Sequence, residues 1–435
     1  MLVVHYGWCL SSGVTPDQIE QVRPRLVEFA AGVLGGLPRS DQRAKGELYV
    51  RGLLTDGARK SMQPMAQRLG VDHQGLQQFI TSSTWEYRQV RANVARWAVA
   101  AIGPDAYVVD DTGFPKDGKA SPCVARQYSG TLGKTGNCQI GVSVQMVTDA
   151  ASLAANWRLF CPASWDDTTI TDPADLAAAV QVCRRRERAG IPEDVRHREK
   201  WRLALDMFDE MLVDWQLPKR PVVGDSGYGD ATLFRLGLDE RGLSYVLQVD
   251  PTATAHPADA RPLTRSYTGR GRPPAPAYPD PPSTFRELTL AAGRRACRRI
   301  TWRTGTNKTS DNPTAAMRSY FLAIRIRPAN RNIPRAEDGS LPESWLIAEW
   351  PPNAPEPVKY WLSTLNERTP LKTLVRLAKI RWRIEHDYRE LKTGLGLDHF
   401  EGRTFTGWHR HVTLVTAAHL FITMLRLDPK AAAPV

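Results

Sequence analysis

Hydrophobic residues recur at helical spacing through the first hundred residues of the chain. Apolar positions three or four residues apart predict an amphipathic helix over 16–34. Two short helical patterns over 65–80 are separated by Gly70, and a further helix is predicted over 84–101. Two helices joined by a glycine turn are typical of a DNA-binding helix-turn-helix, although two packed helices of an all-α region give the same pattern. We therefore predict an all-α, DNA-binding region over 1–102.

The pattern changes at Ala106, where short runs of β-branched and apolar residues begin. Helices are predicted between the later runs, over 197–215 and 229–241. The predicted strands cover 106–111, 139–147, 156–161, 221–225 and 244–249. Three strands followed by helix, strand, helix and strand predict an α/β domain with a mixed sheet, whose first part we place at 103–250.

A third pattern begins after residue 250. Residues 251–283 are rich in Pro, Gly and Arg and are predicted to form a loop, and three strand-like runs follow at 299–303, 319–327 and 344–350. This composition predicts a β-rich insertion over 251–365. Helical patterns over 370–394 and 407–427 predict that helices of the α/β domain occupy 366–428, before a tail at 429–435.

The charge of the chain favours a polyanionic partner. Its 435 residues include 58 Lys+Arg and 46 Asp+Glu, for a net charge of +12, and 45 of the cations are arginine. A GC-rich genome would produce the same excess of arginine, but guanidinium groups also pair bidentately with phosphate. A strongly basic chain of this size is typical of a nucleic-acid-binding protein.

Other features of the composition bear on location. The longest apolar run, 412–424, is too short for a membrane span, so we expect no membrane association. The six cysteines form no CxxC pair, which argues against a zinc ribbon or a disulfide framework. The first ten residues lack a basic segment typical of a secretory signal. These observations predict a cytoplasmic protein.

Two acids end predicted strands. Asp111 ends the first strand, and Asp225 ends the fourth, within the sequence GDSGYGD. Side chains at the carboxyl ends of buried strands point into the crevice where α/β sheets bind ligands. A carboxylate at such a place needs a partner or a metal, although Asp225 alone could instead cap the following helix.

A third acid, Glu385, lies in a predicted helix among cations. Arg381, Glu385, Tyr388 and Lys392 are spaced by four, three and four residues, so they share one helical face. A solvated ion pair would give the same spacing. If the helix docks on the sheet, however, its carboxylate could join the two strand-end acids around a pair of Mg²⁺ ions, which prefer oxygen ligands and support attack at phosphorus.

These motifs resemble those of insertion-sequence transposases of the DDE superfamily, in the branch with a Y-x2-R-x3-E-x6-K signature. Arg381, Glu385 and Lys392 reproduce R-x3-E-x6-K, whereas Ala378 stands at the tyrosine position and Tyr388 is a possible substitute. The segments DDTGFPKDG, RQYSGTLGKTGNCQIGVS and GDSGYGD also resemble this family.

The resemblance implies a fold, a site and an activity. The fold would be an RNase H-like mixed sheet with flanking helices, interrupted by the β-rich insertion. An acid followed by threonine selects Asp111 over Asp110, so the catalytic metal ligands would be Asp111, Asp225 and Glu385, holding two Mg²⁺ ions with Mn²⁺ as a substitute. Arg381, Lys392 and Tyr388 would bind DNA.

The implied protein is a bacterial, nucleoid-associated transposase. It would bind the inverted repeats at transposon ends, cleave double-stranded DNA and join the freed strand to target DNA, acting as a homodimer. The main alternative is a non-cutting DNA-binding protein derived from a transposase. The intact acids argue against it, and the positive charge argues against a glycosidase that uses paired carboxylates.

Two further groups of residues carry separate hypotheses. Trp302 has basic neighbours and could stack on an unpaired base, or it could pack within a strand. The histidines at 399, 409 and 411 lack cysteine partners for zinc, and the arginine between the last two predicts a DNA-facing stretch.

Overall fold

The computed structural model describes residues 16–428, except for 131–132, 265, 267–268, 270–274, 306–307 and 311. The start of the chain, on which the expected lack of a secretory signal rests, and the predicted tail lie outside the described residues. Contacts divide the chain into two compact units. The first unit contains residues 1–105, 110–218 and 383–435, and the second contains 106–109 and 219–382.

Helices form the N-terminal part of the first unit, as predicted. They are α1 (Pro16–Leu34), α2 (Ser40–Leu54), α3 (Met62–Leu69), α4 (His73–Thr81) and α5 (Tyr87–Ile102). Between α3 and α4, Gly70 takes a left-handed conformation at φ +66°, which ends α3 at low steric cost. The side chain of Asp72 then caps α4 by accepting a hydrogen bond from the backbone N–H of Gly75 at 3.3 Å.

The first unit also holds strands that pair around one long strand, β3 (Lys134–Val147). Both β2 (Ala125–Ser129) and β4 (Ser152–Leu159) pair with β3 in antiparallel register. On the other side of β3 lies β1 (Ala106–Pro115), whose residues from Asp110 onward belong to this unit. The remaining helices of the unit are α6 (Leu176–Ala189), α7 (Lys200–Asp209), α12 (Trp382–Thr393) and α13 (Phe405–Leu427).

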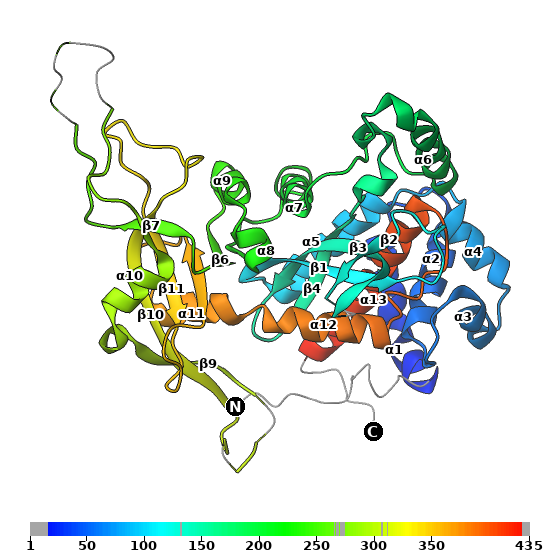
Figure 1. The fold of residues 1–435 in the computed structure, drawn as a ribbon. Helices are drawn as coiled ribbons and strands as arrows, with labels where there is room; N and C mark the ends of the chain where they lie inside the picture. The colour runs from blue at the N-terminus through cyan, green and yellow to red at the C-terminus, as the bar shows by residue number, and fades with distance from the viewer. Residues whose placement is uncertain are drawn as a thin grey trace. The chain divides into compact units, whose positions relative to one another are not determined.

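Helices cover both faces of these strands (Figure 1). Trp157 of β4 donates from its indole N–H to Oγ1 of Thr416 in α13 at 3.2 Å, and its ring lies 6.2 Å from that of Tyr388 in α12. The next residue, Arg158, pairs at 2.6 Å with Glu210, which continues α7. Successive side chains of a strand point to opposite faces, so α12 and α13 pack on one face and α7 packs on the other.

The N-terminal helices share a core with α13. Tyr49 of α2 and Nδ1 of His411 are joined by a 2.9 Å hydrogen bond, and both side chains are buried. Arg91 of α5 is also buried, and its guanidinium donates to the carbonyl of Trp157 at 2.8 Å and to Oγ1 of Thr413. Because every one of these groups is satisfied, charged and polar residues are tolerated within this helical core.

The second unit contains the remaining strands. Its strand order is β1-β5-β6-β12-β11-β10-β7-β8, with β9 paired to β10. The pairs β1–β5 and β5–β6 are parallel, and the later pairs are antiparallel. The strands are β5 (Val222–Gly224), β6 (Tyr245–Val249), β7 (Thr254–Pro257), β8 (Ser283–Thr284), β9 (Arg298–Thr304), β10 (Ala316–Pro328), β11 (Ser344–Glu349) and β12 (Lys359–Ser363). The helices are α8 (Ser226–Gly229), α9 (Thr232–Glu240), α10 (Phe285–Ala292) and α11 (Leu371–Lys379).

The observed elements confirm the predicted mixed α/β class and agree with an RNase H-like fold. The β-rich character expected for the insertion is present in β7 to β12. The helix expected over 370–394 is instead two helices, because α11 ends at Lys379 and α12 begins at Trp382. Helices α6 and α10 were not predicted. The four predicted domain boundaries remain predictions.

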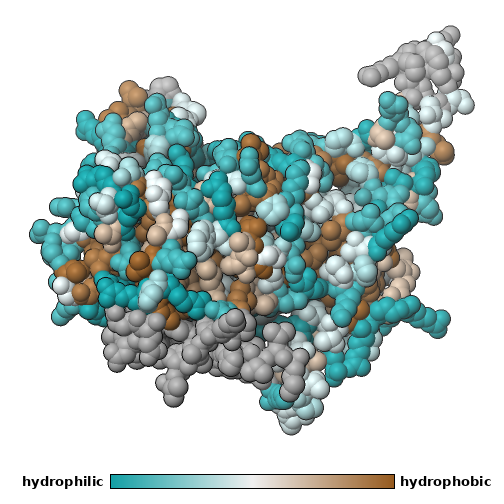
Figure 2. Space-filling model, turned by 180° about the vertical axis from the view of Figure 1, so that it is seen from behind, coloured by the Kyte–Doolittle hydropathy of each residue, from teal (hydrophilic) through white to brown (hydrophobic). Residues whose placement is uncertain are grey.

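The described surface is predominantly polar in the view of Figure 2, where hydrophobic residues are scattered among hydrophilic ones. The most exposed of the large hydrophobic side chains, Tyr128, Leu176 and Val213, come from separate parts of the chain. Within the described residues, every helix is too short or too polar to cross a membrane.

Candidate active site

The first candidate acid, Asp111, lies on β1 and is half-buried. Its Oδ2 atom forms a 3.0 Å ion pair with Nζ of Lys200, at the start of α7. The preceding residue, Asp110, is 6% exposed and accepts the backbone N–H of Asp111 at 2.9 Å. The structure therefore gives the two neighbouring acids different surroundings, and Asp111 is the more accessible of the two.

Helix α12 is fixed to β1 by a buried lysine. Nζ of Lys392 donates hydrogen bonds to Oγ1 of Thr112 at 2.8 Å and to the carbonyl oxygen of Gly113 at 2.7 Å. Burial lowers the pKa of Lys392 to about 8, because the charged form is poorly solvated there. Ile384 and Leu391 are fully buried on the same helix. The helix is thus docked on the sheet, and Lys392 is not part of a solvated ion pair.

Tyr388 provides a second contact between α12 and the strands. Its hydroxyl hydrogen-bonds to Oγ of Ser143 on β3 at 2.7 Å. Burial raises the pKa of Tyr388 well above its usual value, and the negative charges of Asp110 and Asp111 raise it further. The phenol is therefore neutral and lies in the electrostatic field of the two acids.

These two contacts place Glu385 along β1. Lys392 donates hydrogen bonds to Thr112 and Gly113. One turn earlier, Tyr388 lies near enough to Asp110 and Asp111 for their charges to raise its pKa. Glu385 precedes Lys392 by seven residues, which is two turns on the same face and about 10 Å along the axis. The side chain of Glu385 is exposed. Glu385 and Asp111 thus lie on two elements of the first unit that Lys392 joins.

The remaining acid, Asp225, belongs to the second unit and follows β5 directly. It occupies the N-cap position of α8, yet its side chain makes no capping hydrogen bond. Instead, Oδ2 accepts a hydrogen bond from Nη2 of Arg381 at 3.1 Å. Atom Oδ1 is buried and has no hydrogen-bond partner among the residues that the structure describes. A buried carboxylate oxygen without a donor is costly, and a divalent cation would satisfy it.

Comparison with known proteins identifies the family of the chain. A family model described as "DDE superfamily endonuclease" matches residues 32–309, more than half of the chain. The chain belongs to this superfamily. The matched range includes Asp111 and Asp225, whereas Glu385 lies beyond it.

One curated relative of this DDE superfamily member is a "Probable transposase for insertion sequence element IS701" from Microchaete diplosiphon. The two sequences are 34% identical over 96 residues. The aligned stretch covers 21% of this chain and 25% of the relative, so the chain spans about a quarter of the length of that relative.

The residues predicted to contact DNA lie in different surroundings. Arg381 precedes α12 and belongs to the second unit, so it does not continue the helical face of Glu385. Trp302 is half-buried on β9, with its ring edge-on to Phe321 at 5.7 Å and Nζ of Lys379 4.7 Å from its centre. Tyr388 and Lys392 are buried, and their observed contacts position α12. DNA contact by these residues stays a prediction.

A second group of potential metal ligands lies on α12. His386, Asp387 and Glu390 bring three ligand atoms within 4.8 Å of one another. At about 100° per residue, these three residues lie roughly 100°, 200° and 140° around the helix axis from Glu385, so they occupy a different face of α12. Glu390 is already ion-paired with Arg426, and its pKa is lowered by His419 and Arg426 although burial alone would raise it. Because Glu390 already has an arginine partner, this group is a poorer candidate for the catalytic metal site.

The prediction that the histidines near the C-terminus face DNA is wrong for two of them. His409 and His411 are each 1% exposed inside α13, and Arg410 is 4% exposed. Arg410 donates to the carbonyl oxygens of Ile80 and Trp85, while His411 lies between Tyr49 and the carbonyl of Gly396. Tertiary hydrogen bonds satisfy these polar groups, which a linear motif cannot reveal.

Sequence reasoning also missed Lys200. It is separated from Asp111 by 89 residues, and the two meet only because α7 packs on β3. The only available signal was the predicted helix at 197–215, which did not indicate which of its cations would reach the acid.

Proposed function

We propose that this chain is a transposase that cleaves DNA at the inverted-repeat ends of its element and joins the freed strand to target DNA. Membership of the DDE superfamily supports nuclease chemistry. The observation that carries the proposal is the attachment of the helix bearing Glu385 to the strand bearing Asp111 through Lys392.

The proposed metal ligands are Asp111, Asp225 and Glu385, with two Mg²⁺ ions, or Mn²⁺ as a substitute, per active site. The donor set supports this because all three offer carboxylate oxygens and because Oδ1 of Asp225 lacks a partner among the described residues. Bound divalent cations would supply Lewis acidity for in-line attack of water or a 3′-hydroxyl at phosphorus.

The protein groups around these acids have separate tasks. Lys392 and Tyr388 hold α12 against β1 and β3 and so fix the direction of Glu385. Lys200 neutralises Asp111 until cations bind, and Arg381 orients Asp225. No covalent protein intermediate is needed, because water and the DNA hydroxyl are the nucleophiles.

DNA recognition is proposed for the N-terminal helices. Helix α4 buries Leu76, Phe79 and Ile80 and exposes Gln74, Gln77 and Gln78. Such a row of amides can read base edges in the major groove, and the net charge of +12 supports phosphate contacts. Arg381 and Trp302 are proposed to contact the same DNA. Because two ends must be cut, we propose a homodimer on DNA, in the bacterial cytoplasm at the nucleoid.

The test is cleavage of an oligonucleotide that carries an end of the element. We expect nicking that requires Mg²⁺ or Mn²⁺ and is abolished in Asp225→Asn, which keeps the side-chain shape and removes its charge. Binding should weaken steeply with salt, because phosphate contacts release counterions. A wild-type protein that binds the ends but never cuts them would favour the non-cutting alternative.

A further inference from the structure

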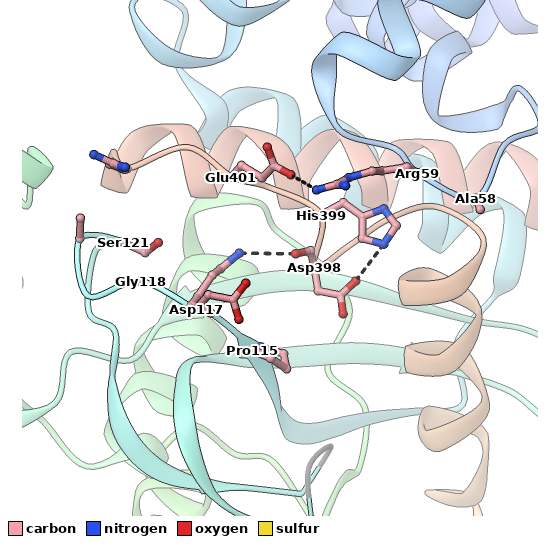
Figure 3. A pocket seen from close by; sticks show the side chains of 12 residues that line it. Ala58, Arg59, Pro115, Asp117, Gly118, Ser121, Asp398, His399 and Glu401 are labelled. Atoms are coloured by element: carbon pink, nitrogen blue, oxygen red, sulfur yellow. Dashed lines mark hydrogen bonds and ion pairs between the residues drawn. The ribbon is translucent and has the colours of Figure 1, made fainter.

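The cavity shown in Figure 3, of about 630 Å³, has no preference for a ligand of one charge. Its described lining contains three cations and three carboxylates, which are Arg59, Lys116, Arg403, Asp117, Asp398 and Glu401. Arg59 and Glu401, joined by a dashed line in Figure 3, form an ion pair at 2.7 Å. The charges of this cavity therefore balance one another, whereas those on the surface of α6 are separated.

Helix α6 lies at the periphery of the first unit and is attached by its last turns (Figure 1). The guanidinium of Arg186, which is 5% exposed, donates to the carbonyl oxygens of Trp165 and Val195 at 2.8 and 2.7 Å. In the first turns, by contrast, Leu176 is 69% exposed and Val180 is 43% exposed. Two neighbouring apolar side chains that remain this exposed favour a contact with another surface.

The exposed face of α6 carries a row of residues at regular intervals. Leu176, Val180 and Arg184 follow one another every four residues, so they lie on one face of the helix. Asp172, four residues before Leu176, is exposed ahead of the helix. Neither Asp172 nor Arg184 has an ion-pair partner within the part of the chain that the structure describes. The order along the row is therefore acidic, apolar, apolar, basic.

This order is complementary to its own reverse. In a symmetric dimer, a contact between two different residues of the two copies occurs twice. With two antiparallel α6 helices about a two-fold axis near Ala178, Leu176 lies against the partner's Val180. Asp172 then lies against the partner's Arg184. Rows of side chains four residues apart are also those that most often interlock between packed helices. Both apolar side chains are thus covered, and each charge gains an opposite charge.

We propose that α6 is a dimer contact, which packs antiparallel against α6 of a second copy of this chain. The proposal names the contact of the homodimer, and its role in transposition rests on the proposed function. Helix α6 has 14 residues and is about 21 Å long, so the contact lies below the roughly 1,200 Å² that stable complexes bury. The contact is therefore weak by itself, and DNA that carries two copies strengthens it by raising their effective concentration.

DNA fits the same face less well than a second copy does. Arg184 and Arg188 would attract phosphates, but Asp172 and Asp175 lie at the other end of the face and would repel them. A duplex would also leave the apolar side chain of Leu176 in water. The separated charges therefore favour a partner that has both signs of charge and an apolar centre.

The test is sedimentation equilibrium of the full chain, without DNA or divalent metal, over about 1–100 µM protein. The wild-type mass should rise with concentration toward that of a dimer. Leu176→Asp should raise the dimer dissociation constant about tenfold or more, because a symmetric contact loses two apolar side chains. Val213→Asp is the matched control, since Val213 is 70% exposed outside α6, and it should keep the wild-type constant. A wild-type protein that stays monomeric throughout overturns the proposal.

Charge reversal tests the antiparallel register. Arg184→Asp and Asp172→Arg should each weaken the dimer, because like charges then face each other twice. An equimolar mixture of these two variants should associate as the wild type does, since each acid again faces an arginine, and so should the double variant. Arg96→Asp, at an exposed position on α5, controls for net charge and should leave the dimer unchanged. If neither the mixture nor the double variant recovers, the proposed contact is wrong.

Two other results have separate meanings. If Arg184→Asp weakens and Asp172→Arg strengthens binding to a duplex while the free protein stays monomeric, DNA occupies this face and the proposal is overturned. Cleavage in Mg²⁺ is scored independently of association. A protein that cuts DNA without the charge-dependent association loses only the α6 contact, whereas one that associates as described and never cuts keeps the contact and loses the proposed function.

Discussion

Nζ of Lys392 lies 2.8 Å from Oγ1 of Thr112, and this hydrogen bond fastens the helix that carries Glu385 to the strand that carries Asp111. The lysine of the R-x3-E-x6-K motif therefore faces the sheet, where burial lowers its pKa to about 8. The spacing of two helical turns between the acid and the lysine brings the ammonium group to the strand, while the side chain of Glu385 is exposed.

Replacing Lys392 should disturb both stability and activity. Lys392→Met leaves Thr112 and the carbonyl of Gly113 without their donor, which we expect to cost about 1–3 kcal/mol in the free energy of unfolding. Cleavage should fall about 10- to 100-fold, as when other residues that orient metal ligands are lost. Urea unfolding and single-turnover cleavage measure the two effects. Lys372→Met, on α11, is the control, and equal cleavage by both variants would remove the positioning role.

Lys200 should control how readily Asp111 takes up a cation. Its ammonium group competes for the carboxylate at 3.0 Å, so Lys200→Met should lower the Mg²⁺ concentration needed for half-maximal cleavage. Calorimetric titration with Mg²⁺ in the absence of DNA gives the same comparison independently of turnover. The contrary result, a higher Mg²⁺ requirement, would show that Lys200 helps to position Asp111 instead of competing for it.

The exposed amides of α4 should determine sequence discrimination. Gln77→Ala is expected to reduce the preference for the element's own end over a scrambled duplex by an amount corresponding to about 1–3 kcal/mol, the discrimination of one bidentate amide–adenine contact. Affinity for the scrambled duplex should stay constant, because phosphate contacts are unchanged. Anisotropy titrations with both duplexes provide the measurement. Gln181→Ala, an exposed glutamine on α6, should leave both affinities intact.

Stability should fall on acidification because of His411. Burial lowers its pKa to about 4 in the folded protein, against about 6.5 when unfolded, so the unfolded chain binds more protons between these values. Stability is therefore lost as the pH falls from about 6.5 to 4, with a limit on the order of 3 kcal/mol for this group. His411→Gln should flatten that part of the curve of unfolding free energy against pH. An unchanged slope would assign the acid sensitivity to other groups.

The sequence predicted local features better than the contacts that assemble them. Strands and the docking of α12 followed from periodicity and from Ile384 and Leu391. Helical spacing could not show that the chain turns at Ile380 and Arg381, which removes Arg381 from the face of Glu385. Lys200 was missed because a contact over 89 residues leaves no local pattern. The run of His, Arg and His in α13 was misread as a surface, since its hydrogen-bond partners come from distant helices.

The buried guanidinium of Arg91 has a consequence for engineering this protein. It donates from α5 to Trp157 in β4 and to Thr413 in α13, so the helical region at the start of the chain is interlocked with the strands and the last helix. Replacing that region with the corresponding region of another protein would leave these acceptors without a donor and would open the interior to water. Retargeting to new DNA is therefore better attempted by changing exposed side chains on a helix surface than by grafting an interchangeable cassette.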